Sequence, residues 1–156
     1  MVWQIAAAGV GLAIANKIRG ESVADHHDVV EQTHDALVDE VPESANLYAD
    51  HLSHRDEIPN PEGEVDGLTH IPDVVVKSGF ANSLIIEVET ADSLQNEPAA
   101  AVLQMQNFSV SGYRRVLVVP DGKGDAEELE TFVEEYDNQI PGKYYVATPD
   151  EVSEFL

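Results

Sequence analysis

The chain has 156 residues, of which 43% are hydrophobic, and this is enough for one globular domain with a real core. Asp and Glu number 30 against 8 Lys and Arg, which gives a formal net charge of -22. There is no Cys, so disulfides and thiolate chemistry are excluded.

The acidic excess coexists with clear apolar periodicity, which disordered acidic chains lack. We therefore expect a folded protein with an acidic surface. An acidic surface keeps a protein soluble in concentrated salt, where the Debye length is only about 3 Å at 1 M, and this favours a halophilic archaeal source. We expect a cytoplasmic location, with membrane association as an alternative. The charge counts against nucleic-acid binding in ordinary buffer, because binders present a basic footprint. Molar salt weakens that objection, and it weakens the attraction from counterion release as well.

The first segment, residues 1–20, is predicted to be an apolar helix that precedes the main domain. Its apolar run of about 14 residues is short for a membrane span of roughly 20. Ala7, Gly11 and Ala15 lie four apart, so one helical face consists of small residues, which allow close helix approach. Three interpretations stay open: a packing helix that forms a homo-oligomer, a membrane-associated anchor, and a cleaved signal.

The rest of the chain, residues 21–156, is predicted to be a single domain that begins with a helix. Over residues 22–41, Val30 and Leu37 lie near one face, and Pro42 ends the pattern. Residues 43–55 are predicted to form a second short helix. The following stretch is rich in Pro and Gly and is expected to be a loop.

Two apolar runs, residues 71–76 and 84–90, are predicted to form a β-hairpin around a turn that contains Ser, Gly and Asn. Each run carries acidic residues near an end. Unpaired carboxylates are costly next to a hydrophobic core, so they usually have partners, and a bound cation is a natural one. If the runs pair antiparallel, Asp73 and Glu87 can face each other.

The C-terminal half alternates helices and strands. A helix is expected to start at Pro98 and to bury one side, with these apolar residues: Val102, Leu103, Met105 and Phe108. Residues 114–120 are predicted to form a fully buried strand, because apolar residues follow one another without alternation after Arg114 and Arg115. The spacing of Asp125 and Glu128 is typical of a capping box at the start of the next helix.

The chain is predicted to end with a strand at residues 143–147 and a short helix. Thr148 and Glu151 have the spacing of a capping box that would open this last helix. The helix between the hairpin and the next strand suits a parallel crossover. We therefore expect an α/β fold with a mixed central sheet flanked by helices.

Pro72-Asp73, followed by Glu87-Val88-Glu89 at the end of the next strand, resembles the PD-(D/E)xK phosphodiesterase superfamily, which has a restriction-endonuclease-like core. The following helix contains Gln104-Met105-Gln106-Asn107-Phe108, which is similar to the Q-x-x-x-Y/F element of the RecB-like and archaeal nuclease branches. The resemblance covers about residues 71–120. The motif is short, so its specificity comes from the arrangement of hairpin, glutamine helix and buried strand.

The resemblance implies a Mg2+- or Mn2+-dependent endonuclease or exonuclease that hydrolyses DNA. A metal neutralises charge and lowers the pKa of the attacking water, and Mg2+ takes few carboxylates together with waters and phosphate oxygens. Asp73 and Glu87 would be the metal carboxylates, and the backbone carbonyl of Val88 would be a third ligand. Glu89 and Gln104 would complete the catalytic set.

One residue departs from the family pattern. Two residues beyond Glu87, on the same strand face, the family has Lys and this chain has Glu89. A second carboxylate could position water or a second metal, as in the few members that are similar in carrying Glu there. Loss of the lysine equally fits a catalytically inactive binding or assembly module with the same fold, tethered through the N-terminal helix. Lys77, in the hairpin turn, is a candidate substitute.

Other candidate residues have ordinary alternatives. Gln104 could hold a phosphate, a water or Glu89, or it could be an exposed helix residue. Glu31 could add an acid from the first helix, or it could lie on a solvated face. For the acids of the motif, the alternative is that Asp73 caps a turn and that Glu87 and Glu89 lie on a solvent-facing strand edge.

The chain contains six histidines, and no pair has the spacing of a zinc motif such as H-E-x-x-H: His26, His27, His34, His51, His54 and His70. The sequence therefore predicts no zinc site. His70 is close in sequence to Asp73 and is a candidate to line the site. Arg114 or Arg115 could contact phosphate, although an ordinary surface ion pair is the alternative for Arg114. No P-loop, G-x-G-x-x-G or G-x-S-x-G motif is present.

Overall fold

The computed structural model describes residues 3–5, 26–52, 55 and 57–156. In this part of the chain the strands are β1 (Trp3–Ile5), β2 (Asn46–Ala49), β3 (Val74–Lys77), β4 (Ser83–Val88), β5 (Tyr113–Val118) and β6 (Tyr144–Ala147). The α-helices are α2 (His26–Val38), α3 (Ala91–Asn96), α4 (Pro98–Asn107) and α5 (Lys123–Tyr136). Two 3-10 helices follow α5 and β6, namely η1 (Asp137–Gln139) and η2 (Pro149–Phe155).

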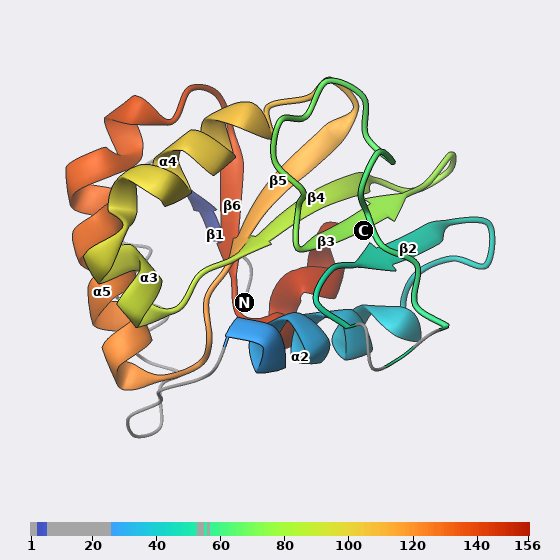
Figure 1. Cartoon of the computed structure of the whole chain (residues 1–156), viewed down its shortest axis with the longest axis horizontal. Coiled ribbons are helices and arrows are strands. Elements are labelled where there is room, and N and C mark those ends of the chain that lie inside the picture. The colour runs from blue at the N-terminus through green and yellow to red at the C-terminus, as the bar shows by residue number, and fades with distance from the viewer. Residues whose placement is uncertain (1–2, 6–25, 53–54, 56) are drawn as a thin grey trace.

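Within the described residues the strands form one six-stranded mixed sheet in the order β1-β6-β5-β4-β3-β2. Strands β4, β5 and β6 are parallel, and the other pairs are antiparallel. Helices α3, α4 and α5 lie on one side of the sheet, whereas α2 and η2 lie together on the other (Figure 1). The predicted α/β fold with a mixed, helix-flanked sheet is confirmed.

Strand β4 is central in this sheet and is buried on both faces. Leu84 and Ile86 pack in the core under α2 and η2, whereas Ile85 packs on the opposite side with Phe108. Burying each such side chain contributes about 1.5–3 kcal/mol to folding. Because side chains alternate along a strand, Glu87 follows Ile85 onto the face covered by α4.

The second predicted helix, at residues 43–55, is wrong. Asn46–Ala49 instead forms edge strand β2, whose Leu47 pairs with Val76 of β3. Leu47 packs in the core under α2, whereas Tyr48 packs in the cluster on the other face, so this segment follows a period of two. The open edge of β3 supplies hydrogen-bond partners that a short isolated helix would lack.

The predicted capping box at the start of α5 is also wrong. The helix begins after Gly122 without a side-chain cap. Asp125 is buried, and its Oδ1 accepts a hydrogen bond of 2.6 Å from the backbone N–H of Ala91, at the start of α3. The Asp125 side chain therefore ties α5 to the turn that leaves β4. Helix α3 itself was not predicted.

Two substitutions of Asp125 are expected to separate its hydrogen bond from its charge. Burial raises the pKa of the Asp125 carboxyl, and its Oδ2 has no hydrogen-bond partner among the described residues. Asp125→Asn keeps an acceptor for Ala91 and removes a buried charge, so we expect unchanged or slightly higher stability. Asp125→Ala orphans the Ala91 N–H and should cost about 1–3 kcal/mol. Urea unfolding of both variants checks this, and equal stabilities would contradict it.

The remaining elements mostly follow the sequence pattern. Pro98 is in the first turn of α4, and Thr148 and Glu151 form the predicted capping box at η2. The expected burial of α4 is confirmed except at Leu103, whose side chain is exposed.

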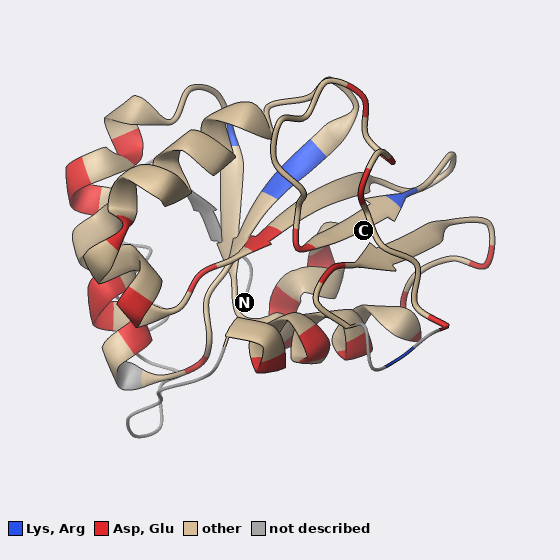
Figure 2. Cartoon of the chain, in the orientation of Figure 1, with Lys and Arg blue, Asp and Glu red and all other residues tan. Residues whose placement is uncertain are grey.

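Exposed carboxylates recur along α2 and α5, and Lys and Arg are few (Figure 2). The expected acidic surface is therefore present on these helices.

The N-terminal prediction is corrected where the structure describes it. Residues Trp3–Ile5 are not the start of a helix but strand β1, which pairs antiparallel with β6. The rest of the predicted helix at residues 1–20 lies outside the described residues. Among the helices that are described, none has the length and apolar character needed to cross a bilayer.

Candidate active site

The two predicted metal carboxylates lie side by side at one end of the β3–β4 hairpin. Val74 pairs with Ile86, so the same antiparallel register brings Asp73 opposite Glu87, as predicted. Both side chains are buried, with 4% of each residue exposed. Asp73 Oδ2 accepts a hydrogen bond of 2.8 Å from the backbone N–H of Val88, which holds the carboxylate against the end of β4.

Glu87 has a buried oxygen that lacks a partner. Its Oε2 makes no hydrogen bond within the described part of the chain. Burial raises the pKa of the Glu87 carboxyl well above its usual value, and the negative charges of Asp73 and Glu89 raise it further. Buried polar atoms are normally satisfied, so an orphaned oxygen beside a second carboxylate fits a bound cation.

Glu89 extends the acidic group into the turn after β4. Its backbone N–H donates to the Val118 carbonyl at 2.9 Å, so the pairing of β4 with β5 continues to this residue. Burial raises the pKa of the Glu89 carboxyl to about 7, with a further contribution from the charge of Asp73. The next residue, Thr90, caps α3 by accepting a hydrogen bond from the Ser93 N–H.

Glu87, Glu89 and Gln104 line one cavity of about 180 Å³, formed between the end of β4 and helices α3 and α4. The full lining is His26, Glu87, Val88, Glu89, Ser93, Glu97, Ala100 and Gln104. Asp73 is not part of the lining, but its carboxylate contacts two residues that are, Val88 and His26. The structure thus brings the four predicted catalytic residues together, and it adds Ser93 and Glu97, which the sequence did not single out.

The solvent-edge alternative for Glu87 and Glu89 is wrong. Strand β4 lies between β3 and β5, so it is not an edge strand. Glu89 is only 7% exposed, close to the values for Asp73 and Glu87. The carboxylates therefore bear the desolvation cost that a surface position would avoid.

Lys77, Glu31 and His70 do not line this cavity. Lys77 Nζ donates to the Glu64 carbonyl at 2.8 Å, at the opposite end of the hairpin, so it does not substitute for the missing motif lysine. Glu31 accepts a hydrogen bond of 3.2 Å from Arg55. His70 lines a separate cavity beneath the loop that precedes β3.

The two arginines of β5 interact with backbone carbonyls rather than with the cavity. Arg115 is buried and donates to the carbonyls of Met105, Pro141 and Lys143. Arg114 donates to the Phe155 carbonyl at 3.2 Å, and no described acidic residue forms the surface ion pair expected of it. Neither guanidinium is a candidate phosphate ligand in this structure.

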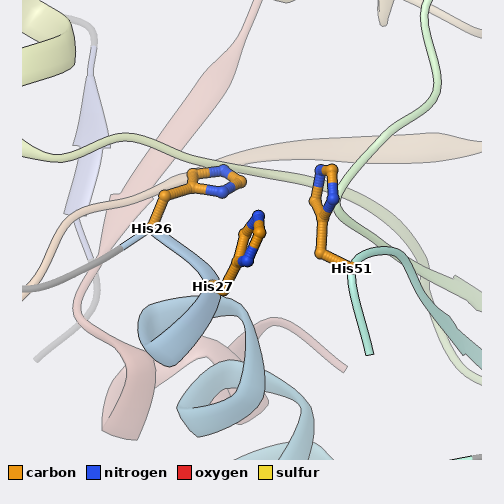
Figure 3. Close-up of side chains that lie close together, drawn as sticks. All are labelled: His26, His27 and His51. Carbon is orange, nitrogen blue, oxygen red and sulfur yellow. The ribbon is translucent and has the colours of Figure 1, made fainter. Parts of the chain in front are cut away.

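Three histidines whose spacing in the sequence did not predict a metal site lie close together beside Asp73. His26 and His27 begin α2, His51 follows β2, and the rings point toward a common space (Figure 3). His26 Nε2 lies 3.1 Å from Asp73 Oδ2, and His51 Nε2 lies 3.9 Å from Asp73 Oδ1. His51 lies here because β2 pairs with β3. The prediction of a helix at residues 43–55 did not include this pairing.

Comparison of the chain with protein-family models, with curated proteins and with solved structures finds no significant match.

Proposed function

We propose that the chain is a Mg2+-dependent nuclease that hydrolyses DNA phosphodiester bonds at the cavity beside Asp73, Glu87 and Glu89. The observation that carries the proposal is the convergence of these buried acids, one with an orphaned oxygen, with Gln104 in the same cavity. The hairpin, glutamine helix and buried strand on which the PD-(D/E)xK resemblance depends also occur in the expected order.

The donor set fits a hard divalent cation. Asp73 and Glu87 would hold Mg2+ through carboxylate oxygens, the ligands that this ion prefers, with the Val88 carbonyl as a third ligand. Continuing the antiparallel register places Pro72 opposite Val88, and proline has no N–H with which to engage that carbonyl. When bound, the ion would neutralise phosphate charge and lower the pKa of the attacking water.

The other cavity residues would act on the water and the substrate. Glu89 would accept a hydrogen bond from the attacking water and orient it, in place of the family's lysine. Gln104 would donate its amide N–H to a phosphate oxygen from the C-terminal half of α4. Because Glu97 adds a third carboxylate to the cavity lining, the site without its ion would repel DNA, and cleavage should depend strictly on the cation.

The proposal is tested by incubating the purified chain with labelled single-stranded, duplex and branched DNA in molar potassium chloride. We expect cleavage of at least one substrate with Mg2+ or Mn2+, and none with EDTA. The high salt screens the net charge of -22. Absence of cleavage on all substrates with both ions would contradict the proposal.

A non-catalytic binding module is the second candidate, and Glu89 in place of the lysine favours it. Mn2+ affinity in the wild type and in Asp73→Asn distinguishes the two, with the exposed Asp66→Asn as a charge-matched control. For a metal site we expect Asp73→Asn to weaken Mn2+ binding by tenfold or more, since it replaces a charged ligand. Equal Mn2+ affinity in Asp73→Asn and Asp66→Asn would show that Asp73 is not a metal ligand, and would favour the binding module.

A further inference from the structure

We propose that His26, His27 and His51 form a second metal site, which binds a transition ion such as Zn2+ and adjoins the carboxylate site at Asp73. One potential ligand atom from each ring lies within 4.8 Å of the other two, and this is the only such group among the described residues. Figure 3 shows the rings converging from the start of α2 and from the turn after β2.

The three rings lie near one another but are not yet at the separations of a bound site. Zn–N bonds of about 2.1 Å place the nitrogens of a tetrahedral site roughly 3.4 Å apart. His27 and His51 are stacked with ring centroids 4.6 Å apart, and His26 meets His51 edge to face at 5.4 Å. His27 and His51 are exposed, so rotation of their rings can bring the nitrogens onto one ion without moving the core.

Two of the histidines contact carboxylates, as the histidine ligands of metal ions commonly do. Ligating histidines commonly use their second ring nitrogen to contact a carboxylate, which fixes the orientation of the ring. His26 Nε2 lies 3.1 Å from Asp73, and His51 Nε2 lies 3.3 Å from Asp50. The Asp50 N–H in turn donates to the Asp73 carbonyl at 2.8 Å, which connects the two supports.

The backbone of His51 is itself constrained. Its φ angle of 62° lies in the left-handed region, which few side chains adopt without a compensating interaction. Asp50 Oδ1 accepts the His51 N–H at 2.9 Å and the Asn60 side chain at 2.7 Å, which holds this conformation. With the backbone held in this way, the His51 ring stacks on the ring of His27.

The chemistry of the ligands separates this site from the carboxylate site. Imidazole nitrogens select Zn2+, Co2+ or Ni2+, whereas the oxygen ligands of Asp73 and Glu87 suit Mg2+ or Mn2+. An ion held by the histidines would place positive charge next to Asp73 and offset part of the acid cluster. This inference does not depend on catalysis, because it concerns binding alone.

The test is a titration of the full chain with Co2+ in molar potassium chloride, followed by visible absorption. We expect one equivalent to give the intense bands of a nitrogen-rich, low-coordinate site, which Zn2+ then abolishes by displacement. His27→Ala and His51→Asn should each weaken Co2+ binding by tenfold or more. Asparagine is chosen at His51 because it tolerates a positive φ.

Two control variants make the assignment specific. His70→Ala removes an exposed histidine outside the cluster, and Glu87→Gln alters the carboxylate site, and neither should weaken Co2+ binding. Loss of binding in Glu87→Gln but not in His27→Ala would overturn the proposal, as would a spectrum no different from aqueous Co2+. Failure of DNA cleavage would leave this test unaffected.

A second readout needs no variant. In the wild-type protein, one equivalent of Co2+ should shift or broaden the ring NMR signals of His26, His27 and His51. The signals of His34 and His70 should stay sharp. Equal broadening of all five would indicate surface binding only, and would overturn the site.

Discussion

Glu87→Gln is expected to abolish Mg2+-dependent DNA cleavage and, at the same time, to stabilise the metal-free protein. The carboxylate is one of the proposed metal ligands, and loss of about 4 kcal/mol of transition-state stabilisation corresponds to a roughly thousandfold lower kcat/KM. Removing the buried charge should raise the free energy of unfolding at pH 8 by about 1–3 kcal/mol. Few substitutions that disable an active site would show both effects.

The stability gain should depend on pH in a defined direction. The pKa of Glu87 is raised in the folded state, chiefly by burial, so the unfolded chain loses this proton at lower pH than the folded chain. Wild-type stability therefore falls as pH rises above the usual glutamate value, whereas Gln does not titrate. The difference between variant and wild type should be small near pH 4 and largest at pH 8.

Urea unfolding in molar potassium chloride with EDTA measures this difference. Any variant that removes an acid from a chain of charge -22 relieves some repulsion, so the exposed Glu134→Gln is the matched control. That control should change stability by no more than about 0.5 kcal/mol. A Glu87→Gln variant that cleaves DNA normally, or that is less stable than the wild type, would contradict the account.

Arg115→Met is expected to destabilise the protein by about 3–5 kcal/mol, the largest stability loss that we predict. The guanidinium donates to Met105 O at 2.6 Å, Pro141 O at 2.5 Å and Lys143 O at 3.2 Å, and only 3% of the residue is exposed. Methionine fills much of the volume and donates to none of these carbonyls. The loss should appear as a lower urea midpoint.

Arg114→Met is the matched control because it removes the same group from the neighbouring residue. Arg114 is only partly buried and donates to one carbonyl, that of Phe155, whereas Arg115 donates to three. We expect a loss of about 1 kcal/mol for Arg114→Met. Similar losses for the two variants would show that the Arg115 contacts add little.

Arg115 also helps to position helix α4, which lines the candidate site. Its bond to the Met105 carbonyl fixes the turn of α4 that carries Gln104, which lines the cavity. Arg115→Met should therefore lower cleavage at temperatures where the protein is still folded. The side chain acts by positioning the helix, since it donates to backbone carbonyls and does not line the cavity.

The sequence predicted the parts of the fold whose signals are local. The hairpin, the buried strand β5 and the amphipathic helix α5 follow from apolar runs and periodicity within single segments. Strand β2 was misread because only four residues form it and because its stability comes from pairing with β3, far along the chain. The short helix α3 was missed for a similar reason: its start is held by Asp125 from α5.

The candidate site was predictable to the same extent. Asp73, Glu87 and Glu89 were recognisable because they are acids at the ends of buried apolar runs. Desolvation of a carboxylate there costs free energy unless the group has a partner. The histidine group was not predictable, since His51 reaches His26 only when β2 pairs with β3. A motif based on sequence spacing cannot detect ligands that depend on an unrecognised strand.

Anomalous diffraction from a crystal grown with Mn2+ tests the central claim most directly, because it locates the ion without reference to activity. The account predicts a peak between the carboxylates of Asp73 and Glu87, beside the Val88 carbonyl. Absence of density at that position, or density confined to the three histidines, would contradict it.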